Sequence, residues 1–470
     1  MAAMAILHGL SPTPVERSRV LEIACGDGAN LIPAAYAVPS SEFVGFDLAR
    51  LPVERGQRRI AELGLRNIRL FQLDLLAAGA DLGRFDYIIA HGLYSWSPEP
   101  VRDRLLALIS DLLTDDGVAF ISFNAMPGGQ LRSMVRDMML FGAKDVEDPE
   151  QQVVEGFRFL RLVMEGLPQN DVYRALIESQ LQRMEDKNPK VTRHDELSEI
   201  YYPVYFTEFV EHARRHGLEY LSEAQLPAPS DCGYRIEPES ELATMAGPDF
   251  LRHEQMLDFV RMRAYRETLV CRPGRGIRRG FPPEHFRRLL FATQAAPAPG
   301  QGGNPTAFVM PGGMRMESNH PKVSALLLAL GAAWPRAVSW DELEPRLARV
   351  GLALDADGVG LIMRLSIARM VELRTWNPRA AHEIAARPRA SACSRHQALG
   401  SPYVTSLLHT SWTFEDAKIR RLLMLLDGTR DRSGLLAAMR AEFPEASEQD
   451  LEAGIEHGLE LFLRSGVLEA

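Results

Sequence analysis

The sequence predicts an α/β fold in which a doubly wound, mostly parallel sheet is covered by helices. Three features of residues 20–124 predict it. An apolar strand pattern at 20–23 runs into a turn that contains two glycines, Gly26 and Gly28. Further strand patterns follow, and helix or turn patterns separate them. Most of these strands are apolar along their length, which is typical of strands buried on both faces of a parallel sheet.

The turn after the first strand has the composition of a ligand site at the carboxyl end of a strand. Glu22 lies near the end of the strand, Gly26 and Gly28 allow close approach of a ligand, and Asn30 opens an apolar helix. Dinucleotide-binding turns prefer a third glycine where this chain has Leu31. An acidic residue in the turn motif instead favours a cationic cofactor, and S-adenosylmethionine carries an ammonium and a sulfonium group.

The next two strands also end in carboxylates. Residues 42–47 end in Asp47, which can accept hydrogen bonds from ribose hydroxyls or, alternatively, cap the following helix. Residues 67–75 form a third strand with Asp74 just beyond its end, where it can accept from an adenine amino group while Leu75 packs on the ring. Three neighbouring carboxylates favour a nucleoside-type ligand along this edge.

An aromatic loop follows the fourth strand, which covers residues 85–92. Tyr94 and Trp96 stand in this loop, before a predicted helix over 99–113 and a fifth strand over 117–124. Their rings can line an acceptor channel or contact a cation. They can equally well only anchor the loop, and the sequence leaves both interpretations open.

As a set, the motifs E-x-A-C-G-D-G, F-D, Q-L-D and D-Y-I-I-A-H-G resemble those of class I S-adenosylmethionine-dependent methyltransferases. The resemblance implies a Rossmann-like, seven-stranded sheet. A helix over 206–216 and strands at 218–224 and 268–271 are the expected last elements of that sheet. The resemblance also implies contacts of S-adenosylmethionine with Glu22, Ala24, Cys25, Gly26, Gly28, Asn30, Asp47, Leu48, Asp74, Leu75, Ala90 and His91.

A second resemblance covers the middle of the chain. Residues 194–197, 202–209 and 263–269 look like the methyltransferase regulatory domain, which occurs in bacterial protein lysine methyltransferases, including rickettsial enzymes. It implies a protein lysine acceptor. Tyr94, Trp96, His194 and Tyr202 are the catalytic candidates, with Tyr205 as a further possible base; His194 is alternatively a helix cap. Few residues precede the first strand, which predicts either a misassigned start or a more open cofactor pocket.

The pattern of elements predicts four parts of the chain. Three helices and a terminal hairpin over 322–376 suggest a winged-helix-like unit, and its mixed-charge helix at 341–350 favours docking of a protein over binding of DNA. The expected divisions are a cofactor-binding core of residues 1–142 and 206–275, a helical insertion or lid of 143–205, a linker of 276–310 and a mainly helical, winged-helix-like C-terminal domain of 311–470.

The composition limits the classes of binding partner and the cellular location that can be expected. The net charge of −9, from 53 basic and 62 acidic residues, argues against a nucleic-acid partner. No apolar run is long enough to span a membrane, and no signal peptide is evident, so the cytoplasm is expected. The spacing of Cys25, Cys232, Cys271 and Cys393 predicts no zinc site. His212 and His216 lie on one helix, but no third ligand is evident, and a solvated helix face is expected.

These observations favour an enzyme that methylates protein lysine side chains by in-line displacement. An alternative is N- or O-methylation of a small-molecule or peptide natural product. A third hypothesis is a sensor that binds the cofactor without turnover. A protein or peptide partner is expected, a homodimer is possible, and neither nucleic acid nor membrane is an expected partner.

Overall fold

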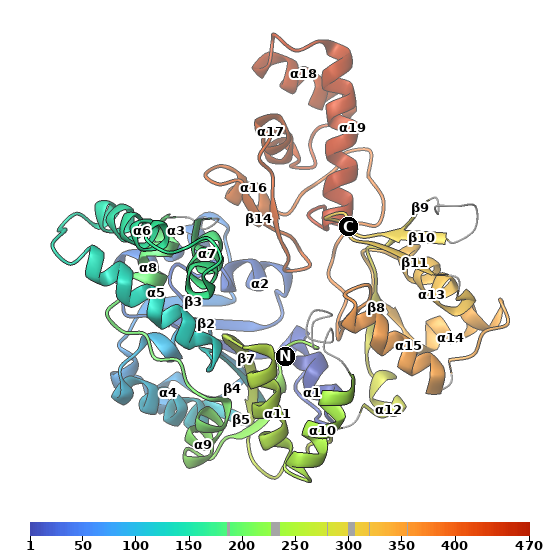
Figure 1. Ribbon diagram of the computed structural model, residues 1–470. Coiled ribbons are helices and arrows are strands. Elements are labelled where there is room, and N and C mark those ends of the chain that lie inside the picture. The colour runs from blue at the N-terminus through green and yellow to red at the C-terminus, as the bar shows by residue number, and fades with distance from the viewer. Residues whose placement is uncertain (186–188, 227–235, 280, 299–305, 319, 355) are drawn as a thin grey trace.

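The computed structural model describes the 470-residue chain except residues 186–188, 227–235, 280, 299–305, 319 and 355. Its centre is a seven-stranded sheet with the strand order β3-β2-β1-β4-β5-β7-β6 (Figure 1). β7 runs antiparallel to both of its neighbours, and β1 to β5 pair in parallel. The strands are β1 (Arg19–Ile23), β2 (Glu42–Asp47), β3 (Ile68–Gln72), β4 (Phe85–Ala90), β5 (Leu113–Asn124), β6 (Glu219–Glu223) and β7 (Tyr265–Cys271).

This arrangement confirms the predicted doubly wound fold and its last two strands. The carboxyl ends of β1 to β6 and the start of β7 share one edge of the sheet, because β7 alone is reversed. Every carboxylate that the sequence placed at a strand end therefore lies along this edge. Ligands of doubly wound sheets bind at such an edge.

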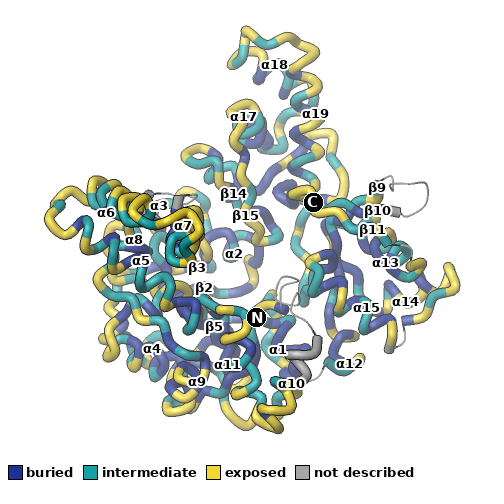
Figure 2. The backbone as a smooth tube through the Cα atoms, viewed as in Figure 1, coloured by how far each residue is buried: buried dark blue, intermediate teal, exposed yellow. Residues whose placement is uncertain are grey.

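Successive side chains of each strand point to opposite faces of the sheet, so the core is divided between these two faces. Val20 of β1 packs with one helical layer, and its neighbour Leu21 packs with the other. Complete burial of such an apolar side chain stabilises the fold by about 1.5–3 kcal/mol. Packing against the two helical layers therefore stabilises the sheet (Figure 2). The first layer contains α1 (Ala2–Leu7), α2 (Leu31–Ala37) and α3 (Arg50–Glu62), and the second contains α4 (Glu99–Leu112) and α9 (Phe206–Arg215).

The helices after β5 form a separate small core beside the sheet (Figure 1). Met139 and Leu160 are fully buried there, and Met134, Met138 and Phe157 pack against them. This methionine-rich segment therefore packs as a core. The helices are α5 (Gly128–Gly142), α6 (Pro149–Glu165), α7 (Val172–Glu185) and α8 (Pro189–Glu196).

Two expectations for the following segments need correction. The chain forms two unpredicted helices, α10 (Ile236–Ala246) and α11 (Phe250–Arg261), between β6 and β7. The expected linker of 276–310 contains regular structure, because its apolar residues pair in two small sheets. It holds α12 (Pro283–Phe286), β8 (Leu290–Ala292), β9 (Ala296–Ala298) and β10 (Thr306–Val309), which pairs with β11 (Arg315–Ser318).

The expected winged-helix-like unit has its three helices but not its terminal hairpin. Its last strand pairs with β8, which lies far upstream in the chain. Sequence periodicity is local and therefore missed this pairing. The elements are α13 (Pro321–Gly331), β12 (Val338–Ser339), α14 (Trp340–Ala348), α15 (Ala356–Ile367) and β13 (Glu372–Arg374).

The last part of the chain has its own core and contains a hairpin (Figure 1). Helices surround the hairpin and bury Leu423, Leu459 and Phe462 completely. The elements are α16 (Ala392–Ala398), β14 (Tyr403–Thr405), β15 (Ser411–Thr413), α17 (Ala417–Leu425), α18 (Arg432–Glu442) and α19 (Glu448–Ser465). Among the helices of the described residues, none has both the length and the apolar character needed to cross a membrane.

Candidate active site

The turn after β1 is built from three residues with positive φ angles. Ala24, Gly26 and Gly28 have φ values of 58°, 56° and 71°. A side chain at Gly28 would approach Leu70 Cδ1 within 2.7 Å, whereas nothing lies within 4 Å of the corresponding position at Gly26. The turn thus needs glycine at position 28 for space as well as for backbone conformation.

Glu22 presents a carboxylate oxygen without a partner beneath this turn. Its side chain is buried, and Oε1 accepts a hydrogen bond of 3.0 Å from Asn30 Nδ2. Oε2 has no hydrogen-bond partner among the described residues. Burial raises the pKa of Glu22 to about 7, and the Asn30 hydrogen bond opposes that shift. A buried oxygen of this kind is costly unless it is satisfied, so the site fits a ligand with an ammonium group.

The two aspartates of the predicted cofactor set have backbone partners. Asp47 Oδ2 accepts from the Gly26 N–H at 2.8 Å, and Oδ1 accepts from the Ala49 N–H at 2.8 Å. Asp74 is exposed and caps a short 3-10 helix by accepting from the Leu76 N–H at 2.9 Å. Glu22, Asp47 and Asp74 therefore lie on consecutive strand ends in the order β1, β2, β3, and their contacts with a cofactor remain predictions.

The other members of the set surround these carboxylates. Cys25 is buried, Ala24 is exposed, and the exposed Leu48 follows directly on Asp47. Leu75 is buried after β3, and the buried Ala90 ends β4. Cys232 lies outside the described residues. These positions place apolar and small side chains along the same edge as the acidic groups.

His91 and Tyr265 meet where β4 ends and β7 begins. Tyr265 OH and His91 Nε2 lie 3.2 Å apart, and the two residues are far apart in the sequence. Tyr265 pairs with Asn124 at the end of β5. In the sequence, Tyr265 belongs to the regulatory-domain pattern of residues 263–269, and it was not expected to be a site residue. Its place in the site depends on the antiparallel pairing of β7 with β5, for which the local sequence carries no signal.

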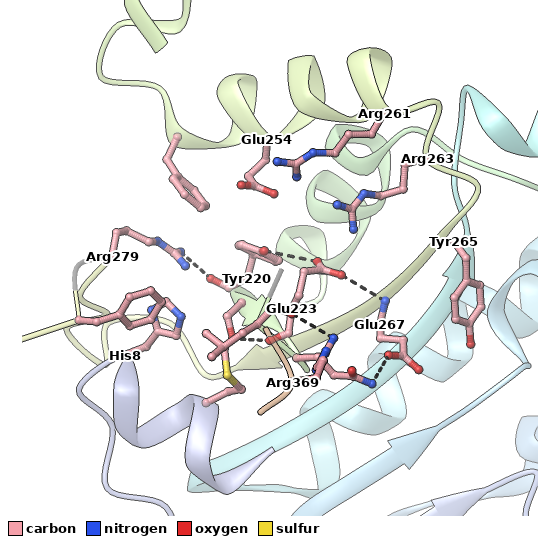
Figure 3. Close-up of a pocket in the computed structure, with 16 residues that line it drawn as sticks. His8, Tyr220, Glu223, Glu254, Arg261, Arg263, Tyr265, Glu267, Arg279 and Arg369 are labelled. Carbon is pink, nitrogen blue, oxygen red and sulfur yellow. Dashed lines mark hydrogen bonds between the residues drawn. The ribbon is translucent and has the colours of Figure 1, made fainter. Parts of the chain in front are cut away.

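A cavity of about 340 Å³ opens beside Tyr265 (Figure 3). Tyr265 stands at one end of the pocket, and His8 and Arg279 stand at the other (Figure 3). Glu267 follows Tyr265 on the same face of β7, because alternate residues of a strand point the same way. Carboxylates and guanidinium groups line the walls, and the charged members are Glu223, Glu254, Glu267, Arg261, Arg263, Arg279 and Arg369.

Arg266 supports this pocket from the opposite face of β7. The side chain is fully buried and pairs with Asp258 at 2.8 Å, Glu223 at 2.7 Å and Glu254 at 3.2 Å. Its guanidinium also lies 3.9 Å from the ring centre of Phe206. These contacts join β7 to β6, α9 and α11, which form the walls around the pocket.

The structure decides between the two interpretations of Tyr94, a ring that lines an acceptor channel and a ring that anchors the loop. Its side chain is only 2% exposed and contacts the rings of Phe123 and Phe209. Its hydroxyl lies 2.8 Å from His212 Nδ1. The ring therefore anchors the loop to α9, and lining of an open channel by Tyr94 is wrong because neighbouring rings cover it.

Trp96 and His194 are the two catalytic candidates that the structure brings together. Their ring centres lie 5.7 Å apart, and the Trp96 ring lies 5.1 Å from that of Tyr201. Two guanidiniums, of Arg132 and Arg136, each lie 5.3 Å from the Trp96 ring centre. This cluster fastens the loop to α5 and to the segment after α8.

Tyr202 adjoins the same loop, because its N–H donates to the Ser95 carbonyl at 2.8 Å, whereas Tyr205 lies at the start of α9. Tyr202 is exposed, with the guanidinium of Arg102 at 3.8 Å from its ring centre. The Tyr205 N–H donates to Glu208 Oε2 at 2.9 Å at the start of α9. The guanidinium of Arg102 also lies 5.6 Å from the ring centre of Tyr94, so contacts connect all four catalytic candidates with the loop of residues 94–96. Their chemical roles remain predictions.

The C-terminal hairpin reaches the cofactor turn. His409, in the turn between β14 and β15, places Nε2 at 2.8 Å from Asn30 Oδ1. Asn30 in turn donates to Glu22 Oε1, so a chain of hydrogen bonds connects the hairpin to the buried carboxylate. Further along this contact, His396 of α16 lies 2.7 Å from Glu62 of α3.

Three family models match separate parts of the chain. A methyltransferase domain matches residues 20–117, and a predicted methyltransferase regulatory domain matches residues 188–272. The PKMT C-terminal winged helix domain matches residues 386–458. This match confirms the expected winged-helix-like C-terminal domain and places it in the last part of that domain, after the 322–376 unit.

Relatives and solved structures agree with these matches. The uncharacterised protein RP789 of Rickettsia prowazekii is 30% identical over 298 residues, 63% of this chain and 54% of RP789, so the chain spans about half of that relative. RP028 of the same organism, also uncharacterised, is 31% identical over 216 residues, 46% of this chain and 86% of RP028. The structure of PKMT2 from Rickettsia typhi in complex with AdoHcy has the same fold, with a TM-score of 0.87 over 99% of this chain and 97% of that chain, at 21% identity.

Proposed function

This chain belongs to the family of S-adenosylmethionine-dependent methyltransferases that carry a regulatory domain and a PKMT winged-helix domain, and we propose that it methylates lysine side chains of proteins. The cofactor half of the proposal rests on Glu22, whose buried Oε2 needs a cationic partner. The acceptor half rests on the carboxylate of Glu267 in the pocket beside His91 and Tyr265.

The residues of the first three strand ends are suited to hold the cofactor. Glu22 would accept from its ammonium group, Asp47 from the ribose hydroxyls and Asp74 from the adenine amino group. The exposed Leu48 and the buried Leu75 supply apolar surface for the base. When bound, S-adenosylmethionine supplies a methyl group on a positively charged sulfur.

The pocket at β7 is suited to a lysine side chain within a polypeptide. Glu267 projects a carboxylate into the cavity, where it can hold an ammonium group. Arg261 and Arg263 line the same cavity and can bind peptide carbonyls or acidic neighbours of the lysine. Charges of both signs fit a polypeptide better than an apolar natural product.

Transfer of a methyl group requires a neutral amine, and free lysine has a pKa of about 10.4. His91 follows the carboxyl end of β4, and its Nε2 lies 3.2 Å from the hydroxyl of Tyr265, which lines the acceptor cavity. An imidazole can accept a proton at neutral pH. We assign His91 the role of taking the ammonium proton and Tyr265 the role of orienting the imidazole.

A small-molecule acceptor is the second candidate, because a cavity of about 340 Å³ lies within the range of small-ligand sites. Transfer of tritiated methyl from S-adenosylmethionine to a bacterial lysate distinguishes the candidates. The expected result is label in protein bands that hydrolyse to methyl-lysine. Label confined to the small-molecule fraction would overturn the lysine acceptor but not the methyltransferase activity, and cofactor binding without any transfer would favour a sensor.

Glu267→Gln tests the acceptor pocket and keeps the shape of the side chain. Loss of one charge pair should raise the KM for a lysine peptide roughly 10-fold, equivalent to about 1.4 kcal/mol, while cofactor affinity stays unchanged. Glu22→Gln is the matched control, because it should weaken cofactor binding instead. An unchanged peptide KM in Glu267→Gln would contradict the assignment of this pocket.

A further inference from the structure

Asp103 of α4 and two histidines at the end of α9 form a cluster of potential metal ligands on the outer side of the sheet. His216 Nε2 lies 2.8 Å from Asp103 Oδ1, and His212 Nε2 lies 3.4 Å from the same oxygen. All three ligand atoms lie within 4.8 Å of one another. The expected solvated helix face is wrong for His212, because its side chain is buried between the helices.

We propose that Asp103, His212 and His216 bind one divalent transition-metal ion of the Zn²⁺ class. The helix places His212 and His216 four residues apart, so that both imidazoles lie on one face. Zn²⁺ binds such nitrogens at about 2.0–2.1 Å and carboxylate oxygens at about 2.0–2.2 Å. Tetrahedral coordination at these lengths separates ligand atoms by about 3.3 Å, which is close to the distances of 2.8 and 3.4 Å between Asp103 Oδ1 and the two imidazole nitrogens.

The surroundings of His212 favour metal binding through Nε2. Nδ1 lies 2.8 Å from the hydroxyl of Tyr94, and donation of the Nδ1 proton to that oxygen leaves the Nε2 lone pair for the metal. Metal-bound histidines usually donate their other ring N–H in this way. The His212 side chain is buried between the helices, and the Asp103 carboxylate offsets the positive charge of the nearby Arg215, which opposes a cation.

Asp103 leaves room for a fourth ligand. Its side chain is 59% exposed, so a water molecule can complete the coordination from the solvent side. α4 and α9 lie side by side there, and the ion would cross-link them (Figure 1). Through His212 the ion would also fix Tyr94, which anchors the loop that follows β4 and His91. The proposed role is therefore structural support of the acceptor side of the site.

Metal uptake by the full-length protein tests the proposal independently of any methyl transfer. The protein is stripped with a chelator and titrated with ZnCl₂ at pH 7.5 by isothermal titration calorimetry. We expect one equivalent of bound Zn²⁺ and a visible absorption spectrum typical of tetrahedral coordination when Co²⁺ replaces it. No uptake, or uptake without a tetrahedral Co²⁺ spectrum, would overturn the proposal.

The partly exposed ligands are the decisive variants, because replacement of buried His212 risks misfolding. His216→Ala and Asp103→Asn should each weaken Zn²⁺ binding at least 10-fold, and circular dichroism checks that the variants fold. Tyr94→Phe should weaken it about 10-fold through the lost second-sphere hydrogen bond. His194→Ala removes an exposed histidine elsewhere and should leave affinity unchanged. Equal affinity of His216→Ala and wild type, or an equal loss in His194→Ala, would refute the site.

Discussion

At the scale of single residues, the cofactor edge combines groups that are costly for the fold but useful for binding. Glu22 keeps a carboxylate oxygen without a partner inside the core. Ala24 has the positive φ angle that glycine tolerates better. Such local costs are typical of functional sites, because a ligand rather than the protein supplies the compensating contact.

Glu22 should make cofactor affinity depend on pH. Its pKa in the free protein is about 7, and a cationic ligand binds the ionised form, so affinity should rise roughly 8-fold between pH 6 and pH 7.5. Calorimetric titration with S-adenosylhomocysteine at several pH values measures this. Glu22→Gln should bind more weakly and remove most of the dependence; an equally steep dependence in the variant would contradict the assignment.

The same carboxylate should lower the stability of the free protein as pH rises. An ordinary glutamate has a pKa of 4.5, and burial raises that of Glu22 to about 7, so ionisation costs stability progressively across this interval. The full cost is on the order of 3 kcal/mol and is present above pH 7. Glu22→Gln should therefore unfold at a higher temperature than wild type at pH 8, and this difference should shrink towards pH 4.5.

Gly26 and Gly28 provide a matched pair of substitutions in the turn. Gly26→Ala introduces only an unfavourable φ angle and should cost about 1 kcal/mol. Gly28→Ala adds a clash with Leu70 and should cost about 2–4 kcal/mol in total. Urea denaturation of both variants measures the difference. Equal losses would show that Leu70 moves aside without cost.

At the scale of elements, strong local patterns were predictable and distant pairings were not. The apolar runs of β1 to β5 stand out in the sequence, because strands buried on both faces need apolar residues throughout. β8 and β9 fall in a segment rich in proline and alanine, and the partners of β8, β12 and β13, lie far along the chain. Periodicity carries no information about such partners.

The candidate site likewise has a part that local sequence patterns predict and a part that depends on distant contacts. The places of Glu22, Asp47 and Asp74 at the strand ends could be predicted, because each lies near the end of its own strand or just beyond it. The contact between His91 and Tyr265 depends on the reversed β7, and the hydrogen bond of His409 depends on a separate domain. Neither contact has a local sequence signal.

Arg266 should be the most sensitive charged residue of β7. Arg266→Met would leave the carboxylates of Glu223, Glu254 and Asp258 short of a buried cation, and removal of one partner from a buried network costs about 3–5 kcal/mol. Arg440→Met, which breaks the surface pair with Glu448 at 2.6 Å, should cost less than about 1 kcal/mol. Chemical denaturation of both variants tests this contrast, and similar losses would contradict it.

At the scale of the whole molecule, the C-terminal domain is connected to the cofactor turn. The hairpin of β14 and β15 brings His409 to Asn30, and α16 contacts α3 through His396 and Glu62. A domain far along the chain thus contributes to the surroundings of Glu22. If the C-terminal domain orients the groups that bind the cofactor, this role explains why it is part of the same chain.

His409→Ala should therefore weaken cofactor binding although the residue belongs to another domain. The Nε2–H of His409 donates to Asn30 Oδ1, which leaves Asn30 Nδ2 directed at Glu22, and loss of a net hydrogen bond of about 1 kcal/mol corresponds to roughly 5-fold weaker binding. Calorimetry with S-adenosylhomocysteine measures the change, and His457→Ala on α19 is the control for loss of an exposed histidine from the same domain.

A double-mutant cycle then shows whether His409 acts through Asn30. Asn30→Ala should weaken binding more than His409→Ala does, because Asn30 contacts Glu22 directly. Once Asn30 is absent, His409 has no amide to orient, so the double variant should bind as Asn30→Ala binds. Additive losses would mean that the hairpin acts on the cofactor by another route, and wild-type affinity of His409→Ala would exclude any contribution of this contact to binding.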